Sequence, residues 1–193
     1  MFLEGATNCY DLPTLKQGQP AAQPVSRADI GVPDGAVLFY SSANFYKLTP
    51  GLLAAWIEIL RQTEETYLLL MPFGGNWSEK YPVAALEAEL QTLCRRAGIS
   101  RARLLLRPAV PTMNDLHAVM ALADIYLDPY PFSAATSLFD AMEAELPIVA
   151  RGSKVARGMH SAAILEEAGL AEWVTEDTTG YIARAVAWAR DAA

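Results

Sequence analysis

The chain has few of the residues that usually identify a redox or metal site. Two cysteines, Cys9 and Cys94, occur in 193 residues, and they do not form a CxxC pair. Together with the two histidines, His117 and His160, they show no spacing typical of metal ligands. We therefore expect reduced thiols in a cytoplasmic protein, with Cys94 in the core and no metal ion bound.

Positive charge is also scarce. The sequence has 15 Lys and Arg against 22 Asp and Glu, which gives a formal net charge of −7 and an isoelectric point of about 4.8. A nonspecific nucleic-acid surface needs clustered basic residues. We expect no nucleic-acid partner, and any anionic ligand must be held by a local site.

Long apolar runs and phosphate-binding fingerprints are missing too. The longest apolar runs fall far short of the about 18 residues of a transmembrane helix, and residues 1–20 lack the pattern of a signal peptide. Neither GxGxxG nor GxxxxGK[ST] occurs, which removes the main support for a classical dinucleotide site or a P-loop. The sequence predicts neither a membrane partner nor a targeting segment.

The composition that remains is that of a globular protein. Hydrophobic residues make up 52% of the chain and the mean hydropathy is +0.15. Residues 1–35 are rich in proline and glutamine with little periodicity, which predicts a linker or an arm wrapping a neighbour. Residues 36–193 are predicted to form one Rossmann-like domain.

Within that domain, short apolar runs alternate with amphipathic segments. Strands are predicted at residues 36–40, 67–71, 103–107, 125–127, 148–150 and, briefly, 172–174. Four helices are predicted over residues 83–97, 115–122, 136–145 and 181–189. A further helix begins at Pro50, and another ends at Gly169. This alternation predicts an α/β fold with a doubly wound parallel sheet, in which ligands bind beyond the carboxyl ends of the strands.

The segment 123–150 joins a buried strand to a helix through a loop of small and hydroxyl residues. Thr136 and Ser137 are placed where free N–H groups and the positive end of the helix dipole favour a phosphate. Asp140 follows one turn later on the same face, which suits a ribose diol. The alternative is that the hydroxyls only cap the helix.

Two other loops at the same edge carry candidate contacts. In residues 41–50, Lys47 could supply a point charge to a phosphate, with Asn44 nearby, or it could simply face solvent. In residues 107–111, two prolines stiffen a backbone whose N–H at Ala109 or Val110 could read a base edge, or the segment is only a tight turn. Each loop follows a predicted strand.

Weaker candidates lie on neighbouring segments. Asp128 ends a strand and is either a base or a turn residue, while His117 and His160 have no visible orienting partner. Trp77 either stacks on a ligand or packs on a rim. The basic residues after the fifth predicted strand are either a ligand contact or solvated charge: Arg151, Lys154 and Arg157.

Several segments together resemble one known family. FYSSANFYKLTPGLLAAWIEIL (39–60), RPAVP (107–111), ADIYLDPYPFSAATSLFDAMEAELPIVA (123–150) and residues 169–191 are similar to the C-terminal, donor-binding half of family 41 glycosyltransferases. That family includes O-linked N-acetylglucosamine transferases and bacterial adhesin N-glucosyltransferases. The resemblance extends over residues 36–191.

The resemblance implies one half of a GT-B enzyme that uses a UDP-sugar as substrate, without metal or other cofactor. It implies that Lys47 contacts the diphosphate and stabilises the leaving group. The residues that it implies for donor binding are Asn44, Lys47, Ala109, Val110, Thr136, Ser137 and Asp140. Val110 corresponds to backbone at the uracil edge.

The sequence also departs from the family pattern. Ala135 stands where some members have a histidine, and Met159 stands where a second arginine occurs in related bacterial proteins. The sugar, N-acetylglucosamine or glucose, is therefore left open. The family's acceptor-side half, with its proposed catalytic base, and its tetratricopeptide repeats have no counterpart in these 193 residues.

The sequence thus predicts the UDP-sugar-binding half of an inverting transferase that modifies protein Ser/Thr or Asn, and the chain alone is expected to be inactive. Its expected partner is an N-terminal acceptor-side half or the repeats. Two alternatives stay open: a nucleotide-sugar-binding module without turnover, and a structural interaction domain that uses the proline-rich arm.

Overall fold

The computed structural model describes residues 21–74 and 81–192, which contain a six-stranded parallel sheet with the order β3-β2-β1-β4-β5-β6. The strands are β1 (Val37–Ser41), β2 (Thr66–Phe73), β3 (Leu104–Pro108), β4 (Ile125–Leu127), β5 (Ile148–Arg151) and β6 (Val174–Thr175). This order confirms the predicted doubly wound α/β fold.

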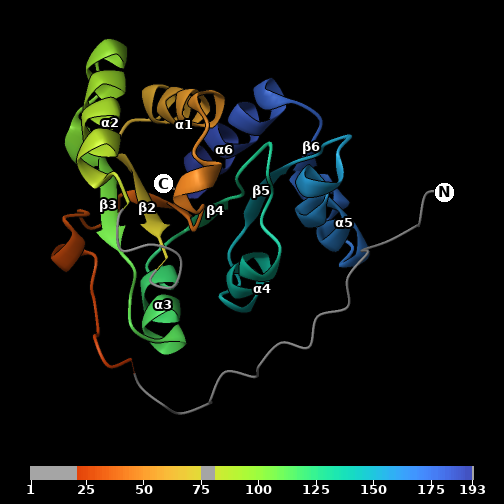
Figure 1. Cartoon of the computed structure of the whole chain (residues 1–193), viewed down its shortest axis with the longest axis horizontal. Coiled ribbons are helices and arrows are strands. Elements are labelled where there is room, and N and C mark those ends of the chain that lie inside the picture. Colours follow the sequence, from red (N-terminus) through yellow and green to blue (C-terminus); the bar gives the residue numbers. More distant parts are fainter. Residues whose placement is uncertain (1–20, 75–80, 193) are drawn as a thin grey trace.

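Helices cover both faces of the sheet (Figure 1). One face carries α1 (Pro50–Gln62), α2 (Val83–Ala97) and α6 (Thr178–Ala192), and the other carries α3 (Met113–Met120), α4 (Thr136–Glu143) and α5 (His160–Glu167). Among the described residues, no helix is long and apolar enough to cross a membrane.

The strand β1 divides the core into two layers. Val37 and Phe39 pack with α1, α2 and α6, whereas Leu38 and Tyr40 pack with α3, α4 and α5. Successive side chains of a strand point to opposite faces, so a strand with helices on both sides must be apolar throughout. All residues of β1 are buried, as its unbroken apolar run predicts.

Local signals set several helix ends. Thr49 caps α1 by accepting a hydrogen bond from the N–H of Leu52, and Pro50 is the first helical residue, as predicted. Gly98 ends α2 with φ of 70°. Cys94 of α2 is buried, in agreement with its predicted core position.

Other predicted ends were wrong. Helix α3 begins at Met113 rather than residue 115, because Thr112 caps it by accepting from the N–H of Asp115. Helix α4 ends at Glu143, α6 begins at Thr178, and β6 starts only at Val174, because residues 171–173 form a 3-10 turn.

The segment before residue 36 packs against the domain. The guanidinium of Arg27 donates to the carbonyls of Leu122 and Ala36 and pairs with Asp124 at 2.8 Å. Ile30 and Val32 are buried in the core layer of α3, α4 and α5. The packed part of the chain therefore extends back to this segment, and residues 1–20 of the predicted lead-in lie outside the described residues.

The strand order places a switch point between β1 and β4. The chain moves outward in one direction from β1 through β2 to β3, and then in the other from β4 through β5 to β6. In open α/β sheets the crevice at such a point, beyond the carboxyl ends of the strands, is the usual ligand site. The loops that leave β1 and β4 contain Lys47 and Thr136.

Candidate functional site

Helix α4 begins without a side-chain cap. Thr136 is the first helical residue, the cap position is Ala135 with φ −133° and ψ −95°, and no described side chain accepts a hydrogen bond from this end. The alternative that Thr136 only caps the helix is therefore wrong. The N-cap position belongs to Ala135, and an alanine side chain cannot accept a hydrogen bond. A helix start without a cap leaves N–H groups available to an anion.

Lys47 reaches across the switch point to the loop before α4. It ends a 3-10 turn, Phe45–Lys47, and its Nζ donates to the carbonyl of Ser133 at 2.8 Å and lies 4.5 Å from the ring centroid of Phe132. Burial lowers the pKa of the Lys47 amine, an effect that Asp128 opposes. The solvated-lysine alternative is wrong, because Lys47 is half-buried and engaged.

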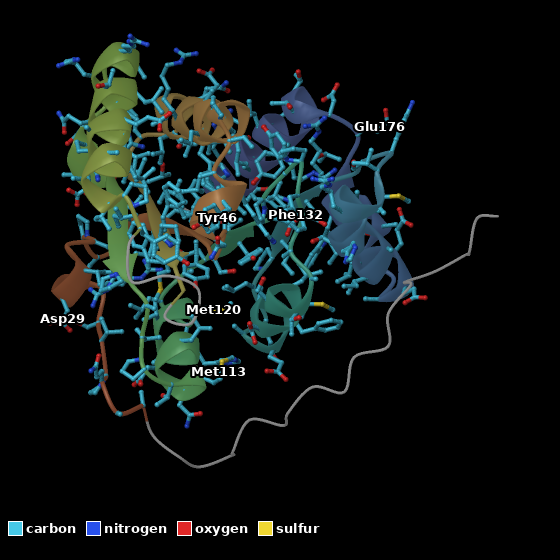
Figure 2. The ribbon with its side chains drawn as sticks, viewed as in Figure 1. Asp29, Tyr46, Met113, Met120, Phe132 and Glu176 are labelled. Atoms are coloured by element: carbon cyan, nitrogen blue, oxygen red, sulfur yellow. The ribbon has the colours of Figure 1, made fainter. Side chains whose placement is uncertain are left out.

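Exposed aromatic rings flank this lysine. Phe132 is 45% exposed and Tyr46 is 70% exposed, and they come from the segments that follow β4 and β1 (Figure 2). Lys47 lies over one face of the Phe132 ring, and the Tyr46 ring packs against Phe45 and Tyr81, but both side chains stay accessible to a ligand or another protein segment. Neither residue was a candidate from the sequence.

Asn44 holds the turn that carries Lys47. Its side-chain oxygen accepts from the N–H of Tyr46 at 3.1 Å, and its amide nitrogen donates to the hydroxyl of Tyr81 at 3.5 Å. The structure thus places Asn44 beside Lys47 with both of its polar groups engaged. Its contact with a sugar donor stays a prediction.

The two hydroxyls at the start of α4 differ. Thr136 is exposed, whereas Ser137 is half-buried near the phenol of Tyr126, which lies 2.9 Å from the Ser42 hydroxyl. Burial raises the pKa of the Tyr126 phenol. Thr136 therefore carries the more accessible of the two hydroxyls.

Asp128 fixes the loop between β4 and α4. One carboxylate oxygen accepts from the N–H of Ala134 at 3.0 Å and from the Ser161 hydroxyl at 2.8 Å. Burial raises the pKa of this carboxyl to about 7, although these hydrogen bonds and Lys47 oppose the rise. Asp128 is fully buried, so it is a turn residue and does not reach a substrate.

The loop after β5 packs tightly on this loop. The carbonyl of Arg157 accepts from the N–H of Ser133 at 3.1 Å, and a Cβ on Gly158 would lie 2.6 Å from the carbonyl oxygen of Pro131. The predicted basic group is split: Arg151 lies over the ring of Tyr130, whereas Lys154 and Arg157 are exposed.

The candidate base-reading loop follows β3. Ala109 is exposed, and Val110 is half-buried against the core layer of α3 and α4. Its backbone contact with a base stays a prediction. Trp77 lies outside the described residues.

Asp140 meets residues that sequence reasoning did not connect with it. Nε2 of His117 lies 3.9 Å from Oδ1 of Asp140 and 3.7 Å from Oε2 of Glu143. Burial raises the pKa of Asp140, Glu143 adds to the rise and His117 opposes it. Only the spacing of Asp140 and Glu143 was visible in the sequence, because His117 comes from another helix.

Known proteins resemble this chain over most of its length. It is 26% identical over 174 residues to the probable UDP-N-acetylglucosamine–peptide N-acetylglucosaminyltransferase SPINDLY of Petunia hybrida, a match that covers 89% of this chain and 18% of that protein. It is 24% identical over 169 residues to the UDP-N-acetylglucosamine–peptide N-acetylglucosaminyltransferase of Caenorhabditis elegans, covering 86% and 14% of the two chains.

Solved structures agree. An O-GlcNAc transferase variant from Thermobaculum terrenum superposes with a TM-score of 0.72 at 27% identity, over 82% of this chain and 29% of that one. The glycosyltransferase WaaG, with a TM-score of 0.58 at 18% identity, covers 86% of this chain and 44% of that one and shares the fold.

The chain thus spans less than a fifth of the length of the curated relatives it matches. The sequence profile of glycosyl transferase family 41 matches residues 16–193, which is nearly the whole chain. With the parallel sheet and the neighbouring structures, this match confirms the predicted family and fold: the chain belongs to glycosyltransferase family 41 and corresponds to its C-terminal, GT-B half.

Proposed function

We propose that this chain is the UDP-sugar-binding half of an inverting glycosyltransferase that modifies Ser/Thr or Asn side chains of proteins. The observation that carries the proposal is that the Lys47 amine meets the loop leading into the uncapped start of α4, at the switch point of the sheet. An ammonium group and free helix N–H groups are complementary to a diphosphate.

Lys47 is suited to bind and then to stabilise a leaving group. A phosphate oxygen can replace the hydrogen bond from its Nζ to the Ser133 carbonyl with a stronger, charge-assisted bond. During transfer, negative charge grows on UDP as its bond to the sugar breaks. An amine and a helix start already in place would stabilise that charge without a metal ion.

The other donor contacts are assigned by the family resemblance. Asp140 would accept hydrogen bonds from the ribose, Thr136 and Ser137 would meet the phosphates, and the backbone of Ala109 and Val110 would read the uracil. Asn44 would support the Lys47 turn. The exposure of Thr136 supports its assignment, and Ser137, which is half-buried, could meet phosphate through its backbone N–H.

Transfer needs more than this half. Of the candidate bases, Asp128 is buried, His117 faces two carboxylates, and His160 is half-buried at the start of α5. We infer that the base and the acceptor surface come from an acceptor-side half or from tetratricopeptide repeats. We also infer a bacterial, cytoplasmic enzyme, from the resemblance to bacterial relatives and the buried free thiol of Cys94.

A binding measurement tests the proposal. Calorimetry should show that the chain binds UDP more tightly than AMP, and equally well in EDTA. Failure to bind UDP, or complete loss of binding in EDTA, would contradict the metal-free site. Because the relatives are named for UDP-N-acetylglucosamine, that sugar nucleotide is the first donor to test and UDP-glucose the second.

Turnover separates the proposal from a binding module. The chain incubated with either donor and a peptide pool should give no mass-shifted peptides, whereas the complete protein should give them. Absence of transfer by the complete protein, with donor binding intact, would favour a nucleotide-sugar-binding module.

A further inference from the structure

A second group of polar side chains lies between α3 and α4. It consists of His117 from α3 with Asp140 and Glu143 from α4, and we call it the His–Asp–Glu cluster. One ligand atom from each of the three side chains lies within 4.8 Å of the others. The three residues therefore converge on one small volume, although they come from separate helices.

The imidazole in this cluster is unsatisfied. Nε2 of His117 is buried and has no hydrogen-bond partner within the described ranges, and the side chain as a whole is 15% exposed. Its distances to Asp140 and Glu143, 3.9 and 3.7 Å, are too long for hydrogen bonds. A buried nitrogen without a partner that faces two carboxylates calls for a third species between them.

The two distances from His117 are close to those expected around a metal ion. Two ligands bound at about 2.1 Å to tetrahedral zinc lie about 3.4 Å apart, so the observed separations exceed a zinc site by only a few tenths of an ångström. One imidazole and two carboxylates are a normal ligand set for zinc and similar ions. Glu143, at 38% exposed, leaves the site open to water.

We propose that His117, Asp140 and Glu143 bind a divalent transition-metal ion of the zinc type, and that this ion competes with the nucleotide for Asp140. The metal site itself is independent of the proposed function. The competition rests on the proposed function, because it requires that Asp140 also bind the ribose of UDP.

Metal binding is tested with the ion alone. The chain, freed of metal by a chelator, is titrated with Zn²⁺ in a calorimeter and with Co²⁺ in a spectrophotometer. The wild-type chain should bind one ion with micromolar affinity, and H117Q should bind at least about tenfold more weakly. H160Q is the matched control, because it changes the other histidine of the chain, and it should bind like the wild type.

Clear outcomes would overturn the metal site. The proposal fails if the wild type does not bind zinc even at millimolar zinc. It also fails if H117Q binds zinc as tightly as the wild type does. Should H117Q fail to fold by circular dichroism, E143Q decides, since Glu143 is exposed and its change leaves the core intact. Unchanged zinc affinity in E143Q would also contradict the proposal.

Competition is tested in a second titration. Zinc should weaken UDP binding at least about tenfold in the wild type and much less in E143Q, which controls for zinc bound by UDP itself. Equal weakening in both proteins would refute competition. If the chain does not bind UDP even without zinc, the proposed function fails, while the zinc titration still decides the metal site.

Discussion

Two half-buried cations, Arg103 at the amino ends of the strands and Lys47 at the carboxyl ends, are bound in different ways. At the amino edge, Arg103 donates to the carbonyls of Leu60, Thr63 and Thr66 and to the Thr66 hydroxyl. At the carboxyl edge, Lys47 donates one hydrogen bond, to the Ser133 carbonyl, and lies over the aromatic ring of Phe132. A guanidinium that donates four hydrogen bonds to the surrounding chain stabilises the fold, whereas a half-buried ammonium with one such bond is suited to bind a ligand.

Removal of the Arg103 side chain should have the largest effect on stability. Arg103→Ala should lower the free energy of unfolding by about 3 to 5 kcal/mol, because three carbonyls and a hydroxyl lose a charged donor. Urea denaturation measures the change. A loss below about 1 kcal/mol would show that water replaces these bonds easily, and the contrast between the two edges would then fail.

The buried carboxyl beside Lys47 should make stability depend on pH. The folded pKa of Asp128, about 7, lies above the ordinary 3.8, so the folded state holds this proton more tightly than the unfolded state does. This group's contribution to stability should therefore fall as pH rises from about 4 to about 7, and stay constant above that.

Asp128→Asn isolates this effect, because an amide keeps an acceptor for Ala134 or Ser161 and cannot ionise. Relative to the wild type, the variant should gain about 2 to 4 kcal/mol between pH 4.5 and pH 8 in urea denaturation. A difference that stays the same at both pH values would mean that Asp128 is ionised throughout.

Loss of the Lys47 amine should affect UDP binding rather than folding. Lys47→Ala should weaken UDP binding by about 1 to 3 kcal/mol, the range for a hydrogen bond to a charged group, with little change in melting temperature. Arg61→Ala is the matched control, since it also removes one positive charge, at the far end of α1. Equal UDP affinity in both variants would exclude Lys47 from the phosphate site.

The smallest effect concerns the ribose. Wild-type protein should prefer UDP over its 2′-deoxy analogue by about 1 kcal/mol, and Asp140→Asn should lose most of this preference, because an amide accepts a hydrogen bond more weakly than a carboxylate. Glu166→Gln, on the exposed side of α5, controls for the change in charge. If Asp140→Asn and Glu166→Gln prefer UDP over the 2′-deoxy analogue equally, Asp140 does not bind the ribose and belongs only to the His–Asp–Glu cluster.

Sequence reasoning found the elements and placed the candidate binding residues at one edge of the sheet, because both depend on local signals. The apolar run of β1 predicts a central strand, and Thr49 with Pro50 predicts the start of α1. A lysine after β1 and hydroxyls after β4 could be placed at one edge, since parallel strands end together.

Contacts between distant segments were not predictable in this way. The bond from Lys47 to Ser133 and the approach of His117 to Asp140 depend on how separate loops and helices pack, and no spacing in the sequence records them. The capping position of Ala135 was missed for a related reason. Its backbone angles, and not its residue type, make Ala135 the N-cap of α4.

The most direct test of the account is a crystal structure of this chain with UDP. The account predicts the diphosphate at the start of α4, against the N–H groups of Thr136 and Ser137, with the Lys47 amine moved from the Ser133 carbonyl to a phosphate oxygen. A diphosphate bound elsewhere, with Lys47 still on the Ser133 carbonyl, would contradict it.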